Sequence, residues 1–200
     1  MLERVAAGDW EALADLFQQY RPRLRRMIQL RLDRRLQGRV DPSDVLQEAF
    51  LDVSRRQADA SQQARSTFFV WLRMITGQKL LEIHRRHLGT QLRDAGREIS
   101  LCQGGCPEVS SQLLASQLLG RFSTASQAAI RAEQQTRLEE ILNSMEPADR
   151  EVLTLRHFEE LTNNEVAEVL GLSKTAASNR YIRAVIRLKG HLNAAAGFFS

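Results

Sequence analysis

Polar side chains suited to binding nucleic acid gather near the C-terminus of this sequence. Between Ser173 and His191 there are five lysines or arginines and no acid. Hydroxyl, amide, ammonium and guanidinium groups donate hydrogen bonds to phosphates and base edges, so this stretch is a candidate DNA-binding surface. Its candidate contact residues are Lys174, Thr175, Ser178, Asn179, Arg180 and Arg183. The alternative interpretation is a helical hairpin whose basic face meets only solvent.

Three carboxylates form a second cluster. Asp41, Asp44 and Glu48 fall on one face of a predicted helix, a spacing that raises the hypothesis of a metal site. A catalytic Mg²⁺ site normally draws its carboxylates from more than one element, and no second acidic cluster of that character lies nearby in the sequence. We therefore interpret the cluster as helix capping and protein interaction. The sequence predicts no metal, no cofactor and no enzymatic activity.

The cysteines offer a weaker metal hypothesis. Cys102 and Cys106, together with His84 and His87, could supply four zinc ligands. Three residues separate the two cysteines, which is looser than the usual spacing of two, and both histidines fall in an arginine-rich predicted helix. We interpret the cysteines as two reduced thiols in a loop, because two cysteines make no disulfide framework.

The basic stretch must be positioned by a helix-turn-helix. Thr162 is the predicted N-cap of a first helix, and Glu165 completes a capping box. Gly171 ends that helix, and Ser173 caps the next one. One face of the second helix is predicted to be apolar and to pack inward; it comprises Ala177, Tyr181, Ala184, Val185 and Leu188. In this motif the second helix enters the major groove of DNA.

The N-terminal part also has helical periodicity. A first stretch begins after the N-cap Asp9, and its predicted inward residues are Trp10, Leu13, Leu16 and Phe17. A second, arginine-rich stretch follows over 20–36. Its arginines form either a solvated face or a surface for nucleic acid or an acidic protein. A third helix begins at Pro42 after the N-cap Asp41 and extends to Val53.

A polar loop over 56–66 precedes a long predicted helix, Phe68–His87. Aromatic residues beside basic ones suit unstacked bases, but packing in the core is the stronger interpretation for at least two of Phe68, Phe69 and Trp71. Residues 89–132 are rich in Gly, Ser and Gln and are interpreted as a connector that holds a short docked helix. Two further helices, near Glu133 and from Pro147, lead into the helix-turn-helix.

Length and charge set the overall organisation. The 200 residues carry 28 Lys and Arg against 24 Asp and Glu, but the charge is unevenly distributed. Eight arginines and one aspartate lie within 21–39, whereas ten acids and three bases lie within 133–170. We predict an all-α fold with two small helical domains, 1–88 and 133–200, joined by a linker over 89–132. Without a signal peptide or an apolar run of about 20 residues, we expect a cytoplasmic protein with no membrane insertion.

Several motifs together carry a resemblance to a known family. They occur in the order Asp41-x-x-Asp44-x-x-Gln47-Glu48-x-Phe50, Trp71-Leu72-x-x-Ile75, Arg85-Arg86 and the C-terminal helix-turn-helix. The chain resembles bacterial RNA polymerase sigma factors of the extracytoplasmic-function (ECF) group over about 9–88 and 133–190. The connector further resembles that of ECF-like factors from planctomycete-type bacteria.

The resemblance implies a sigma factor that binds core RNA polymerase, directs it to promoters and assists promoter opening. The residues that match the contact to the β′ clamp coiled coil are Asp41, Asp44, Gln47 and Glu48. The residues that match the reader of the downstream (minus-10) element are Trp71, Gln78, Lys79, Glu82, Arg85 and Arg86. The loop over 58–66 would hold an unstacked base. The C-terminal domain would read the upstream (minus-35) element and touch the β flap.

This sequence departs from the family pattern where Gln78 and Glu82 replace the usual Asn and Asp, and Gly77 interrupts the promoter-reading helix. The resemblance also admits an anti-sigma regulator as a partner. Two other functions stay open: a stand-alone helix-turn-helix regulator that binds a palindrome as a dimer, and a nucleic-acid enzyme that uses Asp41, Asp44 and Glu48 on a metal. The polymerase-contact motif counts against the first, and the single-helix origin of the carboxylates counts against the second.

Overall fold

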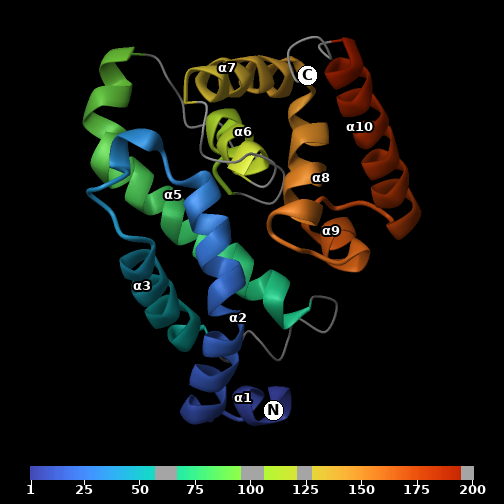
Figure 1. The fold of residues 1–200 in the computed structure, drawn as a ribbon. Helices are drawn as coiled ribbons and strands as arrows, with labels where there is room; N and C mark the ends of the chain where they lie inside the picture. The colour runs from blue at the N-terminus through green and yellow to red at the C-terminus, as the bar shows by residue number, and fades with distance from the viewer. Residues whose placement is uncertain (57–66, 96–105, 121–127, 195–200) are drawn as a thin grey trace.

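The computed structural model describes the chain apart from residues 57–66, 96–105, 121–127 and 195–200 (Figure 1). The described residues fold into helices, as the sequence predicts. In chain order these are α1 (Leu2–Ala6), α2 (Trp10–Arg31), the 3-10 turn η1 (Arg34–Leu36), α3 (Pro42–Arg55), α5 (Phe68–Ala95), α6 (Ser111–Gly120), α7 (Ala128–Ser144), α8 (Pro147–His157), α9 (Asn163–Val169) and α10 (Lys174–Ala194). None of the described helices is both long and apolar enough to cross a membrane.

The N-terminal half comprises α1 to α5. The two predicted stretches at its start join in one continuous helix, α2, with Pro22 inside it; this helix ends at Arg31, and the rest of the second stretch, to residue 36, leads into η1. Leu13, Leu16 and Phe17 are buried as predicted, but Trp10 is 51% exposed and the prediction that it points inward is wrong. Trp10 lies on the first turn of α2, where α1 and α3 leave its outer side uncovered; its ring meets Phe50 of α3 edge to face, with centroids 5.0 Å apart.

The C-terminal half comprises α7 to α10. Between the halves lies the linker segment, residues 106–120, which includes α6 (Figure 1). The predicted docked helix in the connector is confirmed, with Leu114 and Leu119 buried. The helices on either side of the connector are longer than predicted, since α5 continues to Ala95 and α7 begins at Ala128. Within the described part of the connector, residues 106–120 therefore pack against the core.

Arginines of α2 join the two halves. The sequence leaves their role open between a solvated face and a surface for nucleic acid or an acidic protein. In the structure Arg31 lies 2.7 Å from Glu151 of α8, and Arg23 lies 3.3 Å from Glu165 of α9. Much of the acidic surface that these arginines meet therefore belongs to the same chain.

Candidate polymerase and promoter surfaces

The helix-turn-helix forms through the local signals that the sequence predicts. The Thr162 hydroxyl accepts a hydrogen bond from the Glu165 N–H at 3.3 Å, and the Glu165 carboxylate accepts one from the Thr162 N–H at 2.7 Å. Gly171 has φ +62°, a left-handed conformation that suits glycine. The Ser173 hydroxyl caps α10 by accepting a hydrogen bond from the Ala176 N–H at 3.1 Å. Both helix starts are therefore satisfied by side chains within one turn.

The small residues of α10 set its packing face. Ala177 and Ala184 are fully buried, and Tyr181 and Leu188 pack at the edge of the core. Val185 is 37% exposed, so its predicted place on the inward face is wrong. At 100° per residue, Val185 lies well to one side of the line through the two buried alanines.

The candidate DNA contacts of α10 do not all face solvent. The side chains of Lys174, Thr175, Asn179 and Arg183 are exposed, and that of Ser178 is half-buried. Arg180, another candidate contact, is half-buried, because it follows Ala177 by three residues and so lies beside the buried face of α10. Its Nη1 is 3.9 Å from Oδ1 of Asp149.

Asp149 of α8 is a residue that the motifs do not reveal. Its side chain is 4% exposed, and its Oδ2 accepts a 2.6 Å hydrogen bond from Nη1 of Arg187. Asp149 therefore holds α10 against α8 through Arg180 and Arg187, which lie about two turns apart on α10. The sequence places Asp149 in the first turn of a helix and predicts a basic helix after it. It does not show which arginines Asp149 contacts, because that depends on how α8 and α10 pack.

The candidate promoter-reading residues on α5 also divide into buried and exposed side chains. Trp71 is 3% exposed and belongs to the core, so it offers no surface to DNA in this arrangement. Phe69 is also buried, which confirms the core interpretation for two of the three aromatics. The side chains of Gln78, Glu82, Arg85 and Arg86 are exposed. The loop over 58–66 lies outside the described residues.

Lys79 is enclosed by acids. Its Nζ lies 2.7 Å from both Asp52 of α3 and Glu82. Burial alone would lower the pKa of Lys79, but the hydrogen bonds to the two carboxylates raise it above its usual value. The lysine is therefore charged and already paired, which leaves less of its charge for a phosphate.

The acidic face of α3 is open to solvent. Asp41 caps the helix by accepting a 2.7 Å hydrogen bond from the Ser43 N–H, and this bond lowers the pKa of Asp41. The side chains of Asp41, Asp44 and Gln47 are exposed, and Glu48 is half-buried, 3.6 Å from Arg86. Within the described residues, no three His, Cys, Asp or Glu side chains come together as a metal site.

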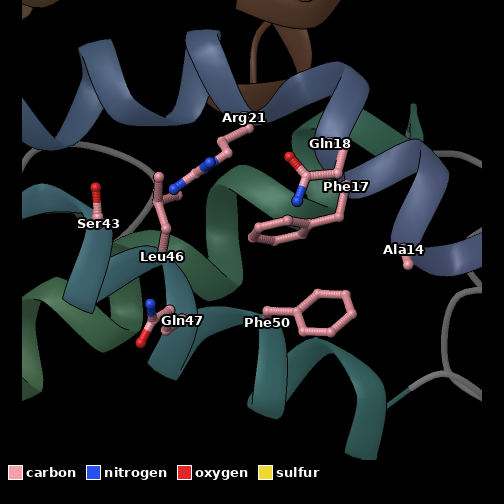
Figure 2. A pocket seen from close by; sticks show the side chains of 8 residues that line it. All are labelled: Ala14, Phe17, Gln18, Arg21, Ser43, Leu46, Gln47 and Phe50. Carbon is pink, nitrogen blue, oxygen red and sulfur yellow. The ribbon is translucent and has the colours of Figure 1, made fainter.

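A groove between α2 and α3 adjoins this acidic face (Figure 2). It encloses about 240 Å³, and its floor contains Phe17 and Phe50, whose ring centroids are 4.9 Å apart. Polar side chains at its edges come from Gln18 and Arg21 of α2 and from Ser43 and Gln47 of α3. Trp10, whose ring contacts Phe50, extends this region with a large apolar side chain that is 51% exposed, and Leu51 of α3 is 52% exposed. Apolar side chains framed by polar ones are typical of a protein-binding surface.

Two of the four candidate zinc ligands, His84 and Cys106, lie in the interior of the protein, whereas His87 is exposed. Nε2 of His84 accepts a 3.2 Å hydrogen bond from the Asp33 N–H, and burial lowers the pKa of His84 to about 4. Cys106 is a reduced thiol in the loop before α6, which confirms the prediction for this residue, and it is fully buried against Gly77 of α5. Cys102 lies outside the described residues.

Comparison with known proteins assigns the chain to a family. The protein-family model described as ECF sigma factor matches residues 1–194. The probable RNA polymerase sigma factor RfaY of Xanthomonas campestris pv. campestris is 28% identical over 149 residues, which cover 74% of this chain and 33% of the relative. The ECF RNA polymerase sigma factor SigD of Mycobacterium tuberculosis H37Rv is 26% identical over 201 residues, which cover 99% of this chain and 85% of the relative. The match therefore spans a third of RfaY but most of SigD.

A solved structure shares the fold. CnrH, determined in complex with the cytosolic domain of CnrY, superimposes with a TM-score of 0.52 at 21% identity, covering 96% of this chain and 95% of CnrH. The family match includes the acidic α3, the long α5 and the helix-turn-helix together, which favours the sigma-factor interpretation over a stand-alone helix-turn-helix regulator. The chain belongs to the family of ECF sigma factors.

Proposed function

We propose that this sigma factor docks on core RNA polymerase through α3 and the groove beside it, and reads promoter DNA with α5 and α10. The observation that carries the docking assignment is the combination of exposed Asp41, Asp44 and Gln47 with the exposed Trp10 and Leu51. Burial of the apolar residues supplies affinity, and the acidic rim selects a basic partner surface. The β′ clamp coiled coil is the proposed partner.

The proposed domain division follows the same roles. Residues 1–88 would carry polymerase docking and reading of the downstream element, and 133–200 would carry reading of the upstream element and contact with the β flap. On α10, Lys174 stands at the helix start as an exposed point charge, which suits phosphate, and the exposed amide of Asn179 suits adenine. Base reading by Arg180 requires its guanidinium to leave Asp149, so we place Asn179 first among the base contacts.

Regulation by a protein partner fits this arrangement. CnrH has been determined with the cytosolic domain of CnrY bound. We propose that a regulator of similar kind silences this chain by covering its polymerase-docking surface, and that the chain acts in the cytoplasm. Free sigma factor would then compete poorly for promoters, because affinity for DNA arises when polymerase presents both reading surfaces together.

The docking assignment is tested by charge reversal. Asp44→Arg with Glu48→Arg is expected to abolish capture of core polymerase, because repulsion adds to the lost pairing. The matched control is Glu133→Arg with Glu140→Arg on the exposed side of α7, which changes the net charge by the same amount. Circular dichroism establishes that both variants are folded. If the α3 variant is folded and captures polymerase as well as the control does, α3 is not the docking surface.

A further inference from the structure

Four ionised side chains meet in the interior, between the two halves of the molecule. Arg31 of α2 and Arg73 of α5 come from the N-terminal half, and Glu151 of α8 and Glu159, which follows α8, come from the C-terminal half. Nη2 of Arg31 lies 2.7 Å from Glu151 and 2.5 Å from Glu159, and Nε of Arg73 lies 2.7 Å from Glu159. All four side chains are 4% exposed or less. We name them the interdomain cluster.

The interdomain cluster is balanced in charge only when the halves are together. It contains two cations from one half and two anions from the other. Removing such ions from water costs several kcal/mol per ion, and a buried ion left without its partner is strongly unfavourable. Burial alone would raise the pKa of Glu159, but Arg31 and Arg73 lower it to about 2, so the glutamate stays charged. Each half therefore supplies the counter-charges that allow the ionised side chains of the other half to stay buried.

The linker segment takes part in the same closure. Nη1 of Arg31 donates a 2.9 Å hydrogen bond to the carbonyl of Pro107, and Nη1 of Arg73 lies 3.5 Å from Sγ of Cys106. Arg150 of α8 reaches Glu108 at 3.7 Å. The segment between the halves is thus fastened to both of them, and it cannot extend while the cluster is intact.

Further contacts surround the cluster. Arg26 donates a 3.3 Å hydrogen bond to the Phe158 carbonyl, and the Arg23 guanidinium stacks 3.6 Å from the ring centroid of Phe69. The Thr67 N–H donates to the Glu168 carboxylate at 3.2 Å. These contacts are nearer the surface and weaker individually, so the buried cluster dominates the closure.

The closed molecule is too short to read both promoter elements. This step depends on the proposed function, in which α5 and α10 read elements centred about 25 base pairs apart, or about 85 Å along straight duplex at 3.4 Å per base pair. A compact chain of 200 residues has a radius of gyration of about 17 Å, which corresponds to a sphere about 43 Å across. The halves must separate before both elements are bound.

We propose that the interdomain cluster is an autoinhibitory lock, which holds the free chain closed and breaks when polymerase and promoter draw the halves apart. In the closed form α10 lies at the outer side of the molecule (Figure 1). Its candidate DNA contacts Lys174, Asn179 and Arg183 stay exposed there. The lock therefore blocks simultaneous use of the two reading surfaces and leaves each one accessible. Apparent affinity for a two-element promoter is reduced by the fraction of molecules that are open.

The opening variant is Glu151→Gln with Glu159→Gln. It keeps the side-chain shapes but leaves Arg31 and Arg73 buried without counter-charge, which favours the open form. Small-angle X-ray scattering of the free protein should show the radius of gyration rising from about 17 Å to above about 22 Å, as expected for two separated halves. In transcription with core polymerase, the concentration of sigma factor at half-maximal activity on a two-element promoter should fall at least tenfold.

The closing variant replaces all four cluster residues by Met. Apolar side chains of similar length remove the cost of burying charge and would be exposed on opening, so the closed form is favoured. We expect an unchanged radius of gyration and at least a tenfold rise in the half-maximal concentration. Glu133→Gln with Glu140→Gln on exposed α7 is the matched control and should behave like the wild type.

The scattering measurement needs no polymerase, so the lock and the proposed function are tested separately. If the wild type with core polymerase transcribes no promoter, the proposed function fails, while the change in radius of gyration still reports on the lock. If the folded Gln variant keeps the wild-type radius of gyration, the cluster is not what holds the halves together. If the Met variant transcribes at wild-type concentrations, closure does not inhibit.

Discussion

Replacing Gly77 by alanine tests how tightly the linker segment is held against α5. A Cβ at this position would lie 2.2 Å from Sγ of Cys106, 3.4 Å from its Cβ and 3.7 Å from its Cα. Cys106 is fully buried, so its sulfur must shift against neighbouring buried atoms to admit a Cβ at this distance. Gly77 lowers the helix propensity of α5, but it also lets Cys106 of the linker segment approach the helix backbone closely.

Two opposing effects set the magnitude. Alanine is better than glycine in a helix interior by about 1 kcal/mol. Overpacking a buried contact costs about 1–3 kcal/mol, and an approach of this closeness falls in the upper part of that range. Gly77→Ala should therefore lower the free energy of unfolding by about 1–2 kcal/mol. Gly190→Ala on α10 is the control, because a Cβ at this position would meet nothing within 4 Å. This change should raise the free energy of unfolding by up to about 1 kcal/mol.

Urea unfolding of a double-mutant cycle measures the contact. The cycle uses Gly77→Ala, Cys106→Ala and both together, because Cys106→Ala removes the sulfur and leaves only its Cβ at an acceptable 3.4 Å. Alanine at 77 should become stabilising in the background without the sulfur, with a coupling energy of at least about 1 kcal/mol. If Gly77→Ala stabilises the wild type as much as Gly190→Ala does, the segment does not pack on α5 as described.

Three other results are expected. The pKa of His84 is lowered from about 6.5 to about 4, so between these pH values the unfolded chain binds more protons than the folded chain. The free energy of unfolding should therefore fall by up to about 3 kcal/mol as the pH drops from 6.5 to 4. Urea titrations of His84→Gln should show a weaker dependence on pH. Thr162→Ala should lower stability by about 1 kcal/mol while Thr162→Ser retains it, and equal melting temperatures for the two would contradict the capping role. In limited proteolysis, residues 106–120 should resist cleavage because their apolar side chains are buried; first cuts there would show that the segment is not docked.

The sequence was sufficient for features that depend on a few neighbouring residues. The capping box at Thr162, the turn at Gly171 and the inward alanines of α10 follow from hydrogen bonds and spacing within one or two helical turns. The order of the motifs likewise indicates the ECF family, because a motif can be recognised from its residue types and spacing without knowledge of how the helices pack. The all-α fold follows from the same periodicity.

Tertiary packing decided which side chains meet across long stretches of chain. Composition shows an excess of arginine near the N-terminus and of acid near the C-terminus, but it does not show that Arg31 finds Glu159, 128 residues away. The exposure of Trp10 and burial of Trp71 depend on which helices cover them, and the position of Arg180 depends on Asp149 of α8. Sequence reasoning gives the sign and the helical face of a charged residue. Its partner is set by the packing of separate elements, since attraction between ions is strong only where that packing excludes water.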